Sequence, residues 1–256
     1  MHYEKAFSYQ FEDQQWPTKL GLGALISLVP ILNFAVVGYM VAILRNVAAL
    51  GAEPLPHWDD FGRKFRDGLI LTLAGLVYAA PMLIALSVPA GLLIASRSAS
   101  RSNGLQDLSN ALASVGGLLL ALAVFVFIVY ALILSIMRPI ILVLFSRDGT
   151  FASCFKLREI AQIVSRHARL FFMTWVVVIL AGIGVGLAVA LVSTVIGWIP
   201  CIGWLASFLL SIGSTIYLIT VDAYLFGQFR AMALQAMPAP PADLTESQRN
   251  PGDLSS

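Results

Sequence analysis

The sequence predicts an all-α fold, a polytopic helical membrane protein with four to five spans, and three observations lead to this fold class. The chain of 256 residues is 59% hydrophobic and only 12% charged, whereas soluble domains are about 25% charged. A helix needs about 20 apolar residues to cross the hydrocarbon core, where its backbone groups must be bonded internally. Four long runs lack any charged residue: 20–44, 69–96, 111–137 and 170–221.

The first run, 20–44, holds Pro30 and Asn33 near its centre and allows two interpretations. As one kinked span it places the N-terminus outside the cell. As a re-entrant hairpin it keeps the N-terminus inside, and non-helical backbone at that depth is tolerated where protein buries it. We favour the hairpin because it also moves Lys5 and Lys19 to the basic side of the membrane.

The segment PLPHWDDFGRKFRDG, residues 54–68, interrupts the apolar sequence. Its prolines stop a preceding helix, and Asp59 and Asp60 suit the start of a new one. Aromatic residues recur every three to four positions beside bases, which is the pattern of a helix lying in the membrane interface. We therefore predict a short interfacial helix that leads into the span at Leu69. Its residues are Trp58, Asp59, Asp60, Phe61, Arg63, Lys64 and Phe65.

Residues 150–168 and the N-terminal Tyr3, Phe7 and Phe11 show the same aromatic and basic pattern. The alternative interpretation is that all of these are ordinary connecting helices packed on the bundle, and both can hold together. Further along the chain, the run 170–221 is too long for one crossing and breaks at 197–203. We expect two crossings there, at about 170–196 and 202–226.

The basic residues indicate sidedness. Twelve of the sixteen Lys and Arg residues lie in 45–68, 138–169 and the C-terminal part, which the positive-inside bias places in the cytoplasm. The loops at 97–110 and 197–201 then face outward. We expect a multi-pass protein of the cell (plasma or inner) membrane with a cytoplasmic C-terminus. Residues 1–237 form a single membrane-embedded helical domain, and 238–256 a disordered polar tail.

Several of these stretches together resemble a known family. They are the acidic, aromatic N-terminus (3–16), LVPILNFAVVGYM, the loop LPHWDDFGRKFRDG and YLFGQF at 224–229. The chain is similar over most of 1–235 to the bacterial and archaeal membrane proteins of domain of unknown function 4013. The resemblance implies a multi-spanning membrane protein of unassigned activity, and it carries over no catalytic residue.

The residue types that intramembrane catalysis requires are sparse. His2, His57 and His167 all lie outside the apolar runs, and no His-Glu-x-x-His motif occurs. Cys154 and Cys201 are too few for a disulfide framework. We therefore predict no enzyme activity, no cofactor and no metal site. The net charge of +2 is too small to suggest a nucleic acid as partner.

Two functions remain for such a protein. A permease or channel-like bundle for a small solute is favoured by the proline-interrupted runs and by four candidate intramembrane polar residues, Asn33, Arg138, Tyr217 and Asp222. The alternative is a non-catalytic membrane scaffold or assembly protein that binds a partner, a second copy or the lipid bilayer through its amphipathic helices. Arg138 and Asp222 lie at similar depth and could pair; alternatively, Arg138 reaches to the interface while Asp222 bonds a neighbouring Tyr or Thr.

Overall fold

The computed structural model describes residues 3–49, 51, 55–101, 104–199 and 202–235, and this part of the chain contains helices and no strand. The described elements, with their bounds, are α1 (Tyr3–Ser8), η1 (Tyr9–Glu12), α2 (Trp16–Ser27), α3 (Asn33–Ala48), α4 (Phe61–Ala99), α5 (Gln106–Asp148), η2 (Phe151–Phe155), α6 (Leu157–Arg166), α7 (Ala168–Ile196) and α8 (Ile202–Gln235). The predicted all-α class is confirmed. The tail predicted at 238–256 lies outside the described residues.

Four helices, α4, α5, α7 and α8, are long and apolar enough to cross a membrane. With 39 and 43 residues, α4 and α5 are about 58 and 64 Å long at about 1.5 Å per residue. Both exceed the roughly 30 Å of a hydrocarbon core. Their ends must therefore project beyond the core, or the helices must be strongly tilted.

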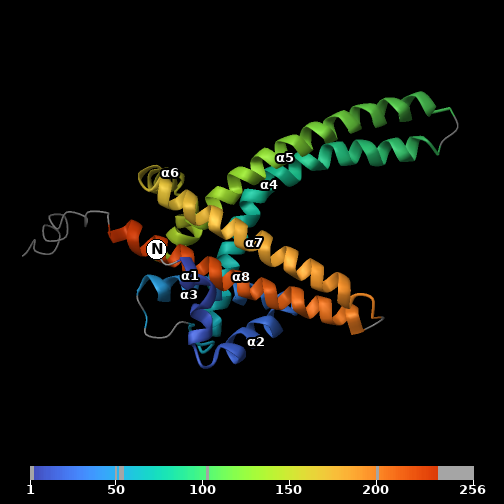
Figure 1. The fold of residues 1–256 in the computed structure, drawn as a ribbon. Helices are drawn as coiled ribbons and strands as arrows, with labels where there is room; N and C mark the ends of the chain where they lie inside the picture. Colours follow the sequence, from blue (N-terminus) through green and yellow to red (C-terminus); the bar gives the residue numbers. More distant parts are fainter. Residues whose placement is uncertain (1–2, 50, 52–54, 102–103, 200–201, 236–256) are drawn as a thin grey trace, which may run out of the picture.

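The spans are arranged as two helical hairpins. The first hairpin pairs α4 with α5 and the second pairs α7 with α8, and the two diverge from a common end of the molecule (Figure 1). Large apolar side chains along both hairpins are exposed, such as Leu118 at 74% and Leu191 at 70%. Such surfaces are stable only against lipid or against other apolar protein.

The first apolar run forms a helix–turn–helix. Helix α2 ends at Ser27 and α3 begins at Asn33, so the run is not one kinked span. At 12 and 16 residues, the two helices reach only about 18 and 24 Å. The chain doubles back, because Lys19 of α2 and Tyr39 of α3 both contact the indole of Trp58. The structure therefore has the hairpin of the two alternatives.

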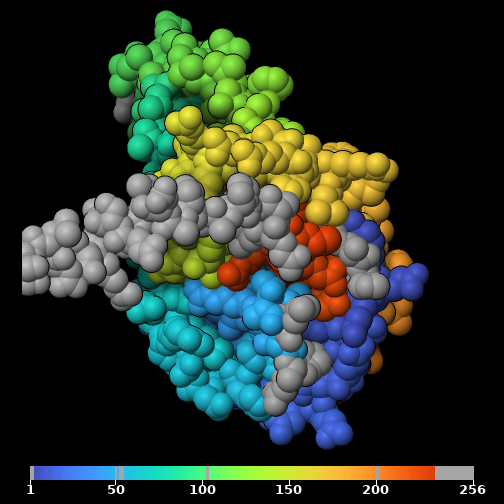
Figure 2. Space-filling view, turned by 90° about the vertical axis from the view of Figure 1, so that its left-hand side faces the viewer, coloured from blue at the N-terminus to red at the C-terminus, as the bar shows by residue number. Residues whose placement is uncertain are grey.

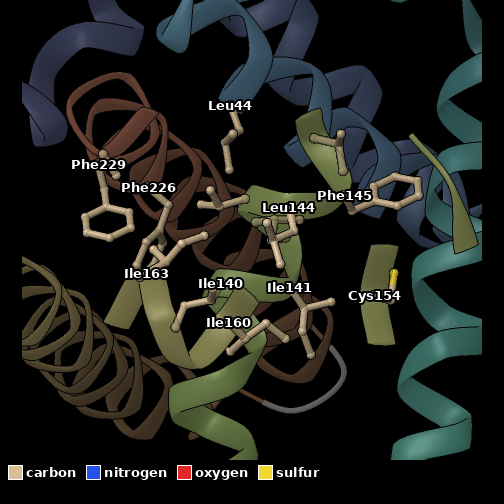
Figure 3. Packing of buried hydrophobic residues seen from close by; sticks show 14 of the residues in the cluster. Leu44, Ile140, Ile141, Leu144, Phe145, Cys154, Ile160, Ile163, Phe226 and Phe229 are labelled. Carbon is tan, nitrogen blue, oxygen red and sulfur yellow. The ribbon is translucent and has the colours of Figure 1, made fainter. Parts of the chain in front are cut away.

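The hydrophobic core lies at the end of α5. Residues 139–146 are buried on every side of the helix, since α3, α4, η2, α6, α7 and α8 surround them. Figure 3 shows Ile140, Leu144 and Phe145 among side chains from these neighbours. A helix that is apolar all round is expected in such a central position.

We call the end of the molecule around this core the base. It comprises α1, η1, α3, the first two turns of α4, residues 139–148 of α5, η2, α6 and residues 216–233 of α8. Figure 2 views this end, where α3, the start of α4, α6 and the end of α8 lie together. The turns joining α4 to α5 and α7 to α8 lie at the opposite ends of the hairpins (Figure 1). The two groups of connections that the charge distribution separated are therefore at opposite ends of the spans.

Candidate functional site

The tightest helix contact in the base is the crossing of α3 and α4. A Cβ atom added to Gly38 would overlap the backbone carbonyl of Lys64, and one added to Gly68 would overlap that of Phe34. The two backbones therefore touch with no side chain between them. Small residues permit such close approach of membrane helices. Only glycine fits at either position, and the crossing sets the direction of the α4 span.

Trp58 joins the same crossing to α2. Its ring stacks on Tyr39, with centroids 4.3 Å apart and planes 4° from parallel. Its indole N–H donates to the carbonyl oxygen of Lys19 at 2.9 Å. Lys19 is itself buried, donating to Asp13 and to the carbonyl of Leu55 at 2.8 Å each. Trp58 is thus a structural wedge between helices, and its ring packs on protein.

A second buried ion pair joins three helices of the base. Arg45 of α3 contacts Asp67 of α4 at 2.6 Å, and the Asp67 side chain is only 3% exposed. The Nε of Arg45 also donates to the carbonyl of Ser146 in α5 at 2.9 Å. A buried carboxylate is stable only with such a partner. Arg45 thereby links the α3–α4 crossing to the core.

The predicted interfacial helix at 58–69 is corrected by the structure. Helix α4 runs without a break from Phe61 to Ala99, so the polar segment forms the first turns of the span itself. Asp60 precedes the helix without a side-chain capping bond and pairs with Arg63 at 3.2 Å. No helix breaker separates this segment from Leu69, and the Gly68 crossing holds it on α3. The remaining members are Asp59, which is exposed, Lys64, which is buried, and Phe65, which packs on Phe34 and Phe61.

The N-terminal segment docks on α8 through polar groups. The Tyr9 hydroxyl donates to the carbonyl of Thr220 at 3.1 Å, and the Thr220 hydroxyl donates to the side chain of Gln10. The Tyr217 hydroxyl donates to the carbonyl of Phe7 at 3.1 Å. Burial strongly raises the pKa of Tyr9, so this hydroxyl stays protonated. Tyr217, a predicted intramembrane polar residue, therefore helps to hold the N-terminal segment.

The predicted pairing of Arg138 with Asp222 is not found in the described structure. Asp222 is half-buried on α8 and has no ion pair or side-chain hydrogen bond with another described residue. Arg138 is exposed on α5, yet its charge is close enough to act on Asp222. The core begins at Pro139, which leaves Arg138 just outside it. Asn33 is exposed beside the turn of the α2–α3 hairpin.

The comparisons with known proteins fit this geometry. Residues 22–196 match the family described as "Protein of unknown function (DUF4013)". The chain belongs to the DUF4013 family. No curated protein and no solved structure matches the chain. The DUF4013 match contains the α3–α4 crossing, the Arg45–Asp67 pair and the core. It is narrower than the resemblance over 1–235, and it leaves out the N-terminal segment and α8.

Metal-binding geometry was also sought in this DUF4013 protein. The described residues contain no group of three or more His, Cys, Asp or Glu side chains that could hold a metal ion. Cys154 is fully buried in η2, where burial raises the pKa of its thiol. His57 is exposed on the loop before α4. Cys201 and His2 lie outside the described residues.

Several residues that matter in the base were not singled out as site residues from the sequence. Gly38, Gly68 and Asp67 lie inside the stretches that carry the DUF4013 resemblance, so a signal was present without a role. Tyr9 and Gln10 gave weaker signals, because their partner Thr220 is more than 200 residues away. In the base, then, four structural features are built from residues distant in sequence: one helix crossing, two ion pairs and one docked segment.

Proposed function

We propose that this membrane protein is a non-catalytic scaffold, in which the two hairpins anchor the base at one membrane surface and the base binds a partner. The observation that carries the proposal is the divergence of the hairpins (Figure 1). Helix α7 buries only Phe171 and Thr174, both in the part nearest the base. A path for a solute needs walls on all sides, and two separated hairpins of one chain do not supply them.

The polar groups that favoured a permease also have structural roles. Tyr217 and Thr220 hold the N-terminal segment. Pro81 and Pro89 lie within the continuous helix α4, and Pro139 within α5, so these prolines do not break their helices. Interrupted helices are the usual feature of a transporter's binding site. Their loss as an argument favours the scaffold.

The proposal places the base in the cytoplasm of a cell in whose plasma or inner membrane the hairpins lie. The α2–α3 hairpin brings Lys5 and Lys19 to the base as well, and only Arg97 and Arg101 remain near the opposite ends of the spans. Such an asymmetry of basic residues is what the positive-inside bias predicts for a cytoplasmic base. A membrane-protein partner, or a second copy of this chain, would then meet the base or the exposed hairpin surfaces.

The scaffold proposal is tested by the size of the native complex. Membranes that contain the tagged protein are solubilised gently and resolved by native electrophoresis, with masses measured for the excised complex. We expect one complex of fixed stoichiometry, weakened by charge reversal at the exposed Arg158 of the base and unchanged by the same reversal at Arg97. A protein that always migrates as a lone protomer would reject the proposal.

A solute path remains the second candidate because of Asp222. An ionisable residue within a span is a functional candidate by default, since it is costly to keep there. Reconstitution in liposomes with a screen of solute fluxes is the direct test. Saturable flux that Asp222→Asn abolishes would favour the permease, and the path would then have to include more than one chain.

A further inference from the structure

Basic residues of the base fall into two groups. Lys19, Arg45, Arg147 and Lys156 each have an acidic partner within 2.8 Å. By contrast, Arg158, Arg166 and Arg169 are exposed and have no ion pair with any other residue that the structure describes. All three lie on α6 or in the first turn of α7, so unneutralised positive charge gathers at this corner.

The corner also contains a cavity. A hollow of about 390 Å³ is bounded by Tyr3 of α1 and by Arg166, His167 and Arg169, with Leu170 and Met173 on its apolar side. No acidic residue borders it. A neighbouring groove of about 700 Å³ shares Arg166 and adds Lys156 and Arg158. Its one acid, Glu159, is bonded to Arg147 at 2.5 Å.

The cavity sits where a span enters the base. Arg169 is the second residue of α7, and Met173, 50% exposed, follows one turn further along the span. Phe172 beside it is 60% exposed. One helical turn, about 5.4 Å, therefore separates a guanidinium-lined hollow from the apolar surface of the span. This is the spacing between the phosphate of a phospholipid and the start of its acyl chains.

We propose that this cavity binds the headgroup phosphate of an anionic phospholipid. Guanidinium groups bind phosphate oxygens in bidentate pairs, and Arg166 and Arg169 supply two such groups without competing carboxylates. Leu170 and Met173 contact the upper part of the acyl chains. Basic pockets beside membrane helices recognise anionic headgroups in this way. The proposal assigns a ligand and does not depend on the scaffold function.

The test uses the full-length protein in a neutral detergent, titrated with phosphatidylglycerol or with phosphatidylcholine of the same acyl chains. Bound lipid is counted by native mass spectrometry, and the melting temperature is followed in parallel. We expect phosphatidylglycerol to bind at least tenfold more tightly. Arg166→Gln and Arg169→Gln should each weaken that binding about fivefold, the effect of one basic residue near an anionic surface.

The matched control is Arg97→Gln with Arg101→Gln, which removes the same charge at the far ends of the spans and should leave lipid binding unchanged. Met173→Gln tests the acyl contact and should weaken both lipids equally. Each variant is first checked for a monodisperse elution profile, and the two single arginine variants are scored separately so that one folding failure is not decisive. Equal binding of the two lipids, or equal loss in the control, would overturn the proposal. So would inorganic phosphate alone giving the full stabilisation, which would indicate a site for a free anion.

Discussion

Gly38 and Gly68 meet where α3 crosses α4, and each leaves room for a backbone carbonyl of the other helix. The crossing fixes the angle at which the first span leaves the base. It also aligns Arg45 with Asp67, since these residues lie on the same two helices. The two glycines therefore support both the packing and the electrostatics of the base.

We predict that Gly38→Ala and Gly68→Ala will each destabilise the protein strongly. An added methyl group would force the helix backbones apart, and overpacking a tight contact costs about 1–3 kcal/mol or more. The matched control is Gly75→Ala in α4, where a Cβ would meet nothing within 4 Å. That substitution should leave the melting temperature in detergent unchanged or slightly raised, because alanine favours helix more than glycine does. Equal losses at positions 68 and 75 would contradict the close crossing.

The second prediction compares two charge pairs by double-mutant cycles. For Arg45 and Asp67, removing one partner leaves the other charge buried, which typically costs about 3–5 kcal/mol. The double variant Arg45→Gln/Asp67→Asn should therefore lose clearly less stability than the two single variants added together. For Arg138 and Asp222, no direct ion pair is present, so Arg138→Gln and Asp222→Asn should be nearly additive.

The readout for both cycles is the free energy of unfolding in detergent under one set of conditions. Contacting residues usually show coupling of about 0.5–3 kcal/mol, and separated ones add within about 0.5 kcal/mol. A coupling for Arg138 and Asp222 as large as that for Arg45 and Asp67 would mean that the two charges pair in solution. The original pairing hypothesis would then stand in place of the structure.

The spans were predictable because length and the absence of charge are local properties. A run such as 111–137 has no soluble alternative, and the structure places it within α5. The surroundings of Trp58 were not predictable in the same way. An aromatic stripe beside basic residues looks identical whether it faces lipid or another helix, and only the glycine crossing and the Lys19 carbonyl decide for protein.

The docking of the N-terminal segment was missed for a related reason. Sequence patterns indicated that Tyr217 needs a polar partner at depth, and a substrate path was one way to supply it. The structure supplies the partner from Phe7, 210 residues earlier. Pairing between distant segments leaves no periodic signal in either, so a single sequence does not reveal it.

The third prediction concerns pH and the Asp13–Lys19 pair. Burial raises the pKa of Asp13, but hydrogen bonds from the Lys19 ammonium and the Gln15 N–H outweigh it, and the net pKa is lowered. A carboxyl with a lowered folded pKa stabilises the fold above its ordinary pKa of about 3.9, and this contribution is lost as pH falls through the folded value. Asp13→Asn should therefore be less stable than the native chain at pH 6–7, by about 1–3 kcal/mol.

This deficit should shrink as the pH is lowered towards 3, because the native Asp13 then becomes protonated as well. Melting temperatures of both proteins, measured between pH 3 and 7 in the same detergent, check the prediction. Asp107→Asn removes an exposed carboxylate at the far end of α5 and should cause little change at any pH. A deficit for Asp13→Asn that stays constant down to pH 3 would show that the carboxylate charge contributes nothing.

The last prediction tests which membrane surface the base faces. Cys154 is fully buried, its backbone carbonyl accepts a hydrogen bond from Tyr78 at 2.8 Å, and burial raises the pKa of its thiol. Since the thiolate is the reactive form, Cys154 should resist maleimide until the protein is unfolded in SDS. It can therefore be kept as a silent cysteine while Cys201 is replaced by Ser and single reporter cysteines are introduced. Ser100 and Ser165 are both exposed, the first at the end of α4 and the second on α6 of the base.

With a membrane-impermeant maleimide on intact cells, Ser100→Cys should be labelled and Ser165→Cys should not. After the cells are opened, both should be labelled, while Cys154 still reacts only in SDS. The reasoning combines burial, which silences Cys154, with the basic charge of the base, which directs it to the cytoplasm. Labelling of Ser165→Cys but not Ser100→Cys on intact cells would invert the topology. Rapid labelling of Cys154 in the folded protein would instead contradict the core packing around η2.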